Sequence, residues 1–341
     1  MITRYYTYRT YLQKRYHKPA YRVGVDAGFS CPNRDIHRHG GCSYCDEYGA
    51  TAVYHRHTES GLAQSGDFVA SLDNPTDPLA TLTSIEMRKH SITEQINDGI
   101  DFLRTRYKAE RFMLYFQAYS NTYGSVPELR EIYDFSLEQA DFSELIIATR
   151  PDCIDKKRVA LISSYREQKV GDVWVELGLQ SSQDRTLKHI GRGHTVKQFC
   201  DAFALLRKAG IKISIHLILG LPGEHYADLF QTAELITRLH PEAVKIHNLH
   251  IPVGTRMYKE YLDGEIQAPS AERHLSYTIY LLEHIPSDII IQRLICDTPL
   301  HRLAAPVKFL NKGKYLGLLQ KELTLFDTWQ GKQLGERCYG I

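Results

Sequence analysis

Short apolar runs alternate along the chain with segments that repeat hydrophobic residues at helical spacing. The apolar, strand-like runs occupy residues 21–26, 111–116, 145–149, 173–178, 211–219 and 243–249, and the helical segments between them occupy 93–107, 127–142, 155–165, 195–209 and 225–239. Strands that are separated by helices pair in parallel through right-handed crossovers. The pattern therefore predicts an α/β fold in which six βα units close, wholly or in part, into a barrel.

Regions on either side of these units complete the predicted organisation, in which residues 23–255 form the barrel core. Residues 1–22 form a basic, tyrosine-rich arm at the N-terminus. Residues 256–341 form a C-terminal extension that we expect to pack on the barrel, with a helical pattern at 270–283 and one further strand at 288–295.

One long segment inside the barrel lacks any periodic pattern. Residues 58–84 are interrupted by glycines and prolines, which predicts a loop. Loops of this length in compact domains commonly serve function. Functional side chains in parallel α/β folds follow the C-terminal ends of the strands. The first predicted strand leads directly to Cys31, which places a group of cysteines at that edge.

Composition narrows the class of protein. The chain has 341 residues and a formal net charge of +2, which is too small to indicate a strongly charged binding partner. It contains no apolar run of about 18 residues, which argues against a membrane-spanning helix. The first 22 residues lack the apolar segment of a secretory signal. We therefore expect a cytoplasmic protein with no membrane partner.

Three of the seven cysteines lie close together, as Cys31-x10-Cys42-x2-Cys45. Three thiolates suit an iron–sulfur cube that leaves one iron open to another ligand, whereas a zinc site needs a fourth ligand such as His37 or His39. A disulfide is disfavoured because it would leave Cys31 unused. The spacing alone leaves iron–sulfur and zinc open. The four scattered cysteines are expected to be ordinary core residues: Cys153, Cys200, Cys296 and Cys338.

The cysteine loop, with Tyr44 before its last cysteine, resembles the radical S-adenosylmethionine (SAM) superfamily. The spacing departs from the usual C-x3-C-x2-C and is similar to the longer loop of the Elongator catalytic subunit group. The chain is most similar to the YhcC/YtqA-like family, from its N-terminal tyrosines to the segment around Trp329. Segments after later strands are also similar to Elongator and coproporphyrinogen-oxidase-like enzymes, although the common Gly-Gly-Glu turn after the second strand is absent.

This resemblance implies a partial (β/α)6 barrel of the radical SAM type. It implies a [4Fe–4S] cluster on Cys31, Cys42 and Cys45, and reductive cleavage of SAM to a 5′-deoxyadenosyl radical. It also implies a one-electron reductant such as a flavodoxin or ferredoxin. The positions that match SAM-binding segments are Tyr44, Gln117, Asn121, Glu176, Gln180, Arg192, His216 and Gly220. No catalytic side chain is assigned. His247 and His250 are expected to line the pocket or to be hydrogen-bonded, rather than to ligate metal.

The substrate is the least determined feature. Similarity to the Elongator group favours transfer RNA, modified at a wobble uridine. The basic arm, with Arg4, Arg9, Lys14 and Arg15 among its tyrosines, has the composition to bind phosphates and stack bases beside the mouth of the barrel. Alternatively, its tyrosines pack onto the barrel. Two other functions stay open: a radical enzyme that acts on a protein or small metabolite, and a noncatalytic, zinc-stabilised RNA-binding protein.

Overall fold

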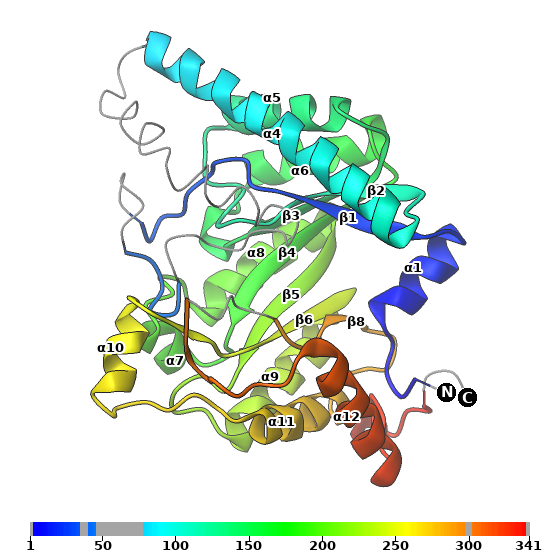
Figure 1. Cartoon of the computed structure of the whole chain (residues 1–341), viewed down its shortest axis with the longest axis vertical. Helices are drawn as coiled ribbons and strands as arrows, with labels where there is room; N and C mark the ends of the chain where they lie inside the picture. The colour runs from blue at the N-terminus through cyan, green and yellow to red at the C-terminus, as the bar shows by residue number, and fades with distance from the viewer. Residues whose placement is uncertain (1–2, 35–39, 46–77, 297–301, 339–341) are drawn as a thin grey trace.

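A curled sheet of seven parallel strands forms the centre of the molecule (Figure 1). The computed structural model describes residues 3–34, 40–45, 78–296 and 302–338. The strands follow the order β1-β2-β3-β4-β5-β6-β8 across the sheet, so β1 and β8 are its two edges. Their bounds are β1 (Ala20–Val25), β2 (Arg111–Phe116), β3 (Phe142–Thr149), β4 (Asp172–Gln180), β5 (Lys212–Leu219), β6 (Ala243–Asn248) and β8 (Ile290–Arg293).

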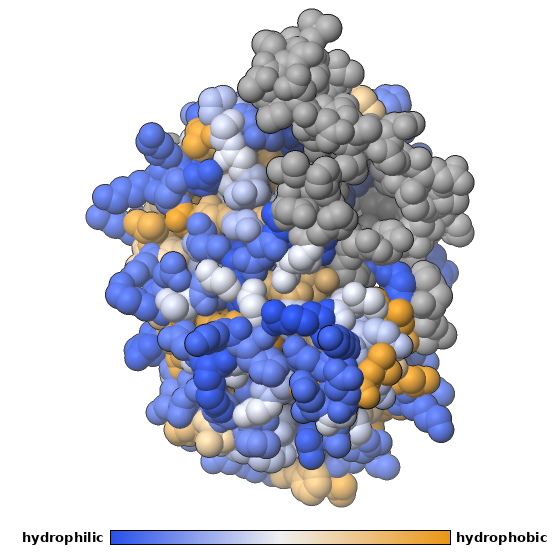
Figure 2. Space-filling model, turned by 90° about the vertical axis from the view of Figure 1, so that its left-hand side faces the viewer, coloured by the Kyte–Doolittle hydropathy of each residue, from blue (hydrophilic) through white to orange (hydrophobic). Residues whose placement is uncertain are grey.

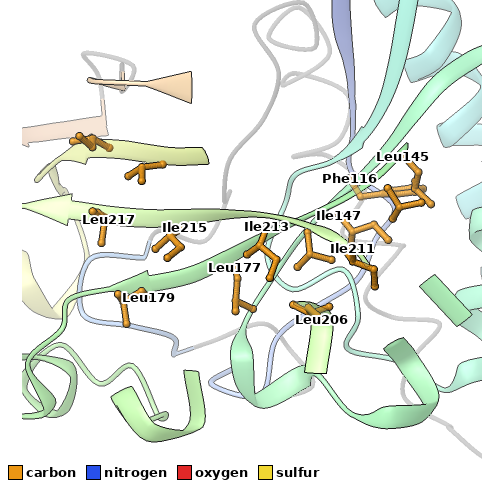
Figure 3. Close-up of a cluster of buried hydrophobic side chains, with 14 of the residues drawn as sticks. Phe116, Leu145, Ile147, Leu177, Leu179, Leu206, Ile211, Ile213, Ile215 and Leu217 are labelled. Atoms are coloured by element: carbon orange, nitrogen blue, oxygen red, sulfur yellow. The ribbon is translucent and has the colours of Figure 1, made fainter. Parts of the chain in front are cut away.

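Helices connect the strands and cover one face of this sheet. They are α4 (Pro78–Tyr107), α5 (Val126–Glu138), α6 (Lys156–Gln168), α8 (Val196–Lys208), α9 (Tyr226–Leu239) and α11 (Ala271–Glu283). Alternate residues of each strand point to opposite faces. Leu145, Ile147, Leu177 and Ile213 therefore share the helix-facing core, where Leu206 of α8 packs with them (Figure 3). This apolar layer fixes the sheet, and the other set of alternate residues faces the inside of the barrel.

The remaining helices and strands complete the described chain. They are α1 (Tyr8–Tyr16), η2 (Pro151–Cys153), α7 (Asp184–His189), β7 (Ile251–Pro252), α10 (Arg256–Leu262), β9 (Leu303–Ala305), α12 (Lys312–Leu325) and η4 (Lys332–Leu334). Strands β7 and β9 form a separate antiparallel pair. Among the helices in the described ranges, none combines the length and the apolar character that a membrane span requires.

The structure confirms the predicted α/β barrel and its six strands, and it adds the predicted run at 288–295 as β8. Two predicted boundaries are wrong. The helix predicted to end at 142 ends at Glu138, and the strand predicted to begin at 145 begins at Phe142. Nearly every residue of β3 is buried, so no alternation of apolar and polar residues marks where the strand begins. Helix α4 begins at Pro78, within the segment predicted as a loop, whose remaining residues 58–77 lie outside the described chain.

The N-terminal arm closes the inside of the barrel at the N-terminal ends of the strands. Tyr16 Oη donates to Glu144 Oε1 at 2.7 Å, near the start of β3, and Arg15 forms an ion pair with Asp172, the first residue of β4. The Tyr11 ring packs edge-on against Trp174, with centroids 5.9 Å apart. The alternative in which the tyrosines pack onto the barrel therefore holds.

Placement of the arm beside the mouth of the barrel is wrong, since the cysteines lie at the opposite ends of the strands. Its charges are also largely engaged within the protein. Arg4 pairs with Asp327 at 2.9 Å, and Lys18 pairs with Glu110 at 3.0 Å. Short-range periodicity did not reveal this position because the arm's partners come from strands far along the chain.

Candidate active site

A cavity of about 380 Å³ lies at the C-terminal ends of the strands, inside the curl of the sheet. Residues from the cysteine loop and from β2 through β8 contribute to its wall. Most of the predicted site residues line it: Cys31, Cys42, Tyr44, Cys45, Gln117, Glu176, Gln180, Arg192 and His216. The structure thus brings together nine positions that the sequence distributes over more than half of the chain.

Two predicted residues lie outside the cavity lining. The Asn121 amide nitrogen donates to the carbonyls of Ala118 and Ala148, at 2.9 and 3.0 Å, so this side chain braces the turn after β2. Gly220 lines a separate cavity next to Pro269. Its φ is +85°, and a Cβ at this position would lie only 2.5 Å from Pro269 Cγ, so the backbone requires glycine there.

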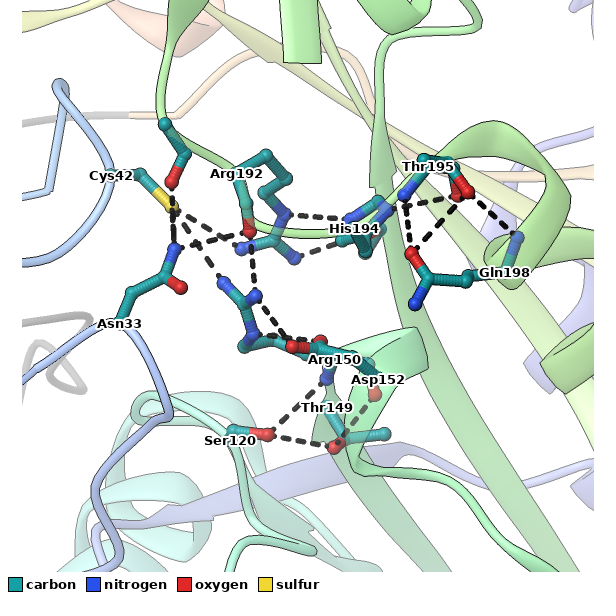
Figure 4. A network of polar contacts seen from close by, with 12 residues as sticks. Asn33, Cys42, Ser120, Thr149, Arg150, Asp152, Arg192, His194, Thr195 and Gln198 are labelled. Carbon is teal, nitrogen blue, oxygen red and sulfur yellow. Dashed lines mark hydrogen bonds and ion pairs between the residues drawn. The ribbon is translucent and has the colours of Figure 1, made fainter. Parts of the chain in front are cut away.

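Nitrogen donors contact the sulfurs of Cys42 and Cys45. Cys42 Sγ lies 3.5 Å from Asn33 Nδ2, 3.6 Å from Arg192 Nη1 and 3.9 Å from Arg150 Nη1 (Figure 4). Cys45 Sγ accepts from Arg34 Nη2 at 3.2 Å. Donors with positive charge favour anionic sulfur. The sequence analysis missed three of them. Asn33 and Arg34 lie inside the cysteine loop itself, between Cys31 and Cys42, whereas Arg150 reaches Cys42 from the end of β3, 108 positions along the chain.

These donors act against burial in setting the thiol ionisation. Burial opposes the charged form of Cys42, but Arg192, Arg150 and the Asn33 amide outweigh it and lower the pKa of this thiol. Burial raises the pKa of the Cys45 thiol despite Arg34. Of these two thiols, Cys42 is therefore the one whose surroundings favour the thiolate.

Arg192 is held in place by its own neighbours. Its Nη2 donates to the Gly178 carbonyl at 3.1 Å, and its Nε donates to His194 Nε2 at 3.1 Å. Burial and the nearby Arg192 charge lower the pKa of His194 to about 4, which keeps this imidazole a neutral acceptor. A Cβ on residue 178 would lie 2.3 Å from Arg192 Nη2, so the guanidinium fits only beside glycine.

The floor of the cavity holds a buried charge cluster centred on Glu176. Its carboxylate contacts Arg22 at 2.6 Å, Lys245 at 2.7 Å and His216 at 2.8 Å, and it accepts from Tyr115 Oη at 2.6 Å. These side chains come from inward-facing positions of β1, β2, β4, β5 and β6, which the curl of the sheet brings together. Glu176 and His216, both predicted to contact the cofactor, therefore contact each other.

Burial and mutual charge determine the ionisation of this floor. Burial opposes the charged form of Glu176, but Lys245 and Arg22 hold the pKa of its carboxyl well below the ordinary value. Burial lowers the pKa of Lys245 to about 7 despite Glu176, and burial together with Lys245 lowers the pKa of His216 to about 4. The cluster therefore carries fixed charge on Glu176 and Arg22, while His216 is neutral near pH 7.

Comparison with known proteins identifies the family. The Radical SAM superfamily matches residues 31–236, and the Radical_SAM C-terminal domain matches residues 241–324. The protein belongs to the radical SAM superfamily. The uncharacterized protein YtqA of Bacillus subtilis (strain 168) is 33% identical over 330 residues, which cover 96% of this chain and 92% of that protein. This confirms the predicted family.

Other similar proteins match part of the chain or its fold. The tRNA uridine(34) acetyltransferase of Methanocaldococcus infernus is 31% identical over 173 residues, which cover 50% of this chain and 32% of that protein. The solved structure of Elp3 from the same organism has a TM-score of 0.63 at 21% identity and covers 72% of this chain and 61% of that one. Methylornithine synthase (PylB) has a TM-score of 0.51 at 12% identity over 96% of this chain and 88% of that one. These two structures share the fold of this chain.

The residues present fit the cofactors of this superfamily, a [4Fe–4S] cluster and SAM. Three thiols line one cavity, and positively charged donors contact two of them, Cys42 and Cys45, which suits an anionic, thiolate-held cluster. Within the described ranges, no three His, Cys, Asp or Glu side chains come together as a site for one metal ion. His37 and His39, the candidate zinc ligands, lie outside those ranges. The family decides for an iron–sulfur enzyme and against the noncatalytic zinc protein.

Proposed function

We propose that this radical SAM enzyme modifies the wobble uridine of transfer RNA. The observation that carries the proposal is the sequence similarity of half the chain to a tRNA uridine(34) acetyltransferase. When bound, the cluster and SAM supply a carbon radical that removes hydrogen from an unreactive position. Cys31, Cys42 and Cys45 would hold the cluster, and Arg192 would meet the carboxylate of SAM, since a guanidinium suits a carboxylate.

The surface beside the cysteine loop supports a nucleic-acid substrate. Helices α7 and α10 flank this loop, because the Ser43 N–H donates to the Ile190 carbonyl at 2.8 Å and the Met257 N–H donates to the Ser43 carbonyl at 2.9 Å. Figure 2 shows that this side of the molecule is largely hydrophilic. Exposed cations on the two helices are Arg185, Lys188, Arg256 and Lys259. Phosphates bound here would bring a base close to the cavity.

The RNA substrate is tested with a pair of charge variants. The double variant Lys188→Ala/Lys259→Ala should weaken binding of unmodified transfer RNA and lower the log–log salt slope by about one per lysine. The matched control is Lys108→Ala/Lys208→Ala, because both lysines are exposed and precede β2 and β5 at the opposite ends of the strands. Affinity is measured by fluorescence anisotropy over a series of salt concentrations.

Turnover gives the second measurement. Transfer RNA from cells that lack this enzyme, incubated with reduced protein and SAM, should gain a modified uridine at the wobble position, detected by mass spectrometry of its nucleosides. If the two double variants bind transfer RNA with equal affinity, the RNA contacts another surface. Absence of RNA binding by the parent protein at low salt would leave a protein or small metabolite as the substrate.

A further inference from the structure

Cys296 lies on the wall of the cavity that the cysteine loop also lines. The cysteine loop and Cys296 come from opposite edges of the sheet, since Cys31 follows β1 and Cys296 follows β8. The curl of the sheet brings both edges to one space (Figure 1). The sequence analysis assigned Cys296 to the core with the other scattered cysteines. That assignment is wrong for Cys296, which lines the cavity, whereas Cys200, which is equally half-buried, packs against the core.

Two polar residues from the end of β6 hold this thiol. The Cys296 N–H donates to Asn248 Oδ1 at 2.9 Å, and Asn248 Nδ2 lies 2.7 Å from His250 Nε2. Cys296 Sγ lies 3.7 Å from His250 Nδ1 and 3.6 Å from Asn248 Oδ1. Cys296, His250 and Asn248 thus form one connected group that lines the cavity.

The hydrogen bonds determine which nitrogen of His250 carries a proton. Asn248 Oδ1 accepts from the Cys296 N–H, so Asn248 Nδ2 must be the atom that donates to His250 Nε2. In the neutral imidazole the hydrogen then sits on Nδ1, which points it at the Cys296 sulfur. His250 in this tautomer donates to the sulfur. It does not accept the thiol proton, so the group is not arranged as a base-activated nucleophile.

We propose that the Cys296 thiol donates a hydrogen atom to carbon radicals formed in this cavity. An S–H bond is weaker than the C–H bonds of nucleosides, so transfer of hydrogen from sulfur to such a carbon radical is downhill. In this step the S–H bond breaks, a C–H bond forms, and the unpaired electron moves to sulfur. The inference rests on the radical chemistry of the superfamily and is independent of the RNA substrate.

The thiyl radical left on Cys296 must be returned to thiol. One electron reduces it to thiolate, and one proton completes the thiol. The low-potential one-electron reductant that SAM cleavage already requires supplies the electron, and solvent supplies the proton. His250 Nδ1–H is placed to hydrogen-bond the thiolate as it forms, which makes His250 a positioning residue.

The test uses SAM cleavage without substrate in deuterated water. Exchange converts the thiol to S–D, so a radical that takes hydrogen from Cys296 yields 5′-deoxyadenosine with one added deuterium. Dithionite-reduced protein with its cluster should give this labelled product, measured by mass spectrometry. Cys296→Ser should lose the label and keep its iron content, because the hydroxyl O–H also exchanges but is too strong to donate. The matched control, Cys200→Ser, replaces a half-buried cysteine on α8 and should keep the label.

A second measurement uses the parent protein, so it tests the proposal even if the serine variant does not fold. During SAM cleavage with the spin trap DMPO present, peptide mapping should find a trap adduct on Cys296 and none on Cys200. Unlabelled 5′-deoxyadenosine from the parent, an equal label in Cys296→Ser, or absence of the adduct on Cys296 would each overturn the proposal.

Discussion

Replacement of Glu176 by glutamine tests the charge cluster at the floor of the cavity. The variant keeps the shape of the side chain but removes its charge, which leaves Arg22 and Lys245 buried without their shared partner. Their nitrogens lie 2.6 and 2.7 Å from the carboxylate oxygens. Loss of one member of a buried ion pair costs about 3–5 kcal/mol, which is a large part of the roughly 5–15 kcal/mol by which domains are stable.

The pH dependence of this loss is set by Lys245. Its pKa is lowered from 10.5 to about 7 in the folded protein, so the folded state binds fewer protons than the unfolded state between these values. This group therefore makes the parent protein more stable as the pH rises from about 7. The Glu176–Lys245 attraction exists only while Lys245 is charged. The loss of unfolding free energy in Glu176→Gln should thus be larger at pH 6 than at pH 9. The contribution of the lost Glu176–Arg22 pair to this loss should be the same at both pH values.

The assay is urea unfolding of the protein under anaerobic conditions, followed by circular dichroism at both pH values. Glu138→Gln is the matched control, because Glu138 forms an exposed pair with Lys169 at 3.4 Å, and such pairs contribute less than about 1 kcal/mol. If Glu176→Gln loses no more stability than Glu138→Gln, the floor is not held by this charge. If it loses only SAM affinity, Glu176 acts on the cofactor alone.

Two further predictions concern the cluster and the arm. Cys31→Ala, Cys42→Ala and Cys45→Ala should each lose the brown colour and the roughly four iron per chain of the anaerobic protein, whereas Cys153→Ala and Cys338→Ala should keep both; iron in any of the first three variants at the parent level would remove that cysteine from the ligand set. Tyr16→Phe removes the 2.7 Å bond to buried Glu144, so unfolding should become easier by about 1–3 kcal/mol while RNA affinity stays the same. A loss of RNA affinity at unchanged stability would instead show that the arm contacts RNA.

The sequence alone predicted the features that short stretches of chain encode. The alternation of apolar runs and helical spacing indicated the parallel barrel, because each strand and helix is specified by residues within a few positions of one another. The spacing of Cys31, Cys42 and Cys45 and their place after the first strand indicated a metal site, with iron–sulfur and zinc both open, and the family resemblance then implied the iron–sulfur cluster. Resemblance to a family then led to Arg192 and Gln180, which the fold does bring to the cavity.

Only the tertiary structure decided contacts between residues that lie far apart in the chain. Arg22 and Glu176 are separated by 154 positions and Arg150 and Cys42 by 108, and no local pattern marks either pair. The same holds for Tyr16 of the arm, which reaches Glu144, and for Cys296, which the curl of the sheet turns toward the cysteine loop. Strand order and sheet curvature set these distances, and both arise from packing of the whole core. The sequence therefore determined the chemistry at the first strand, and the fold determined what surrounds it.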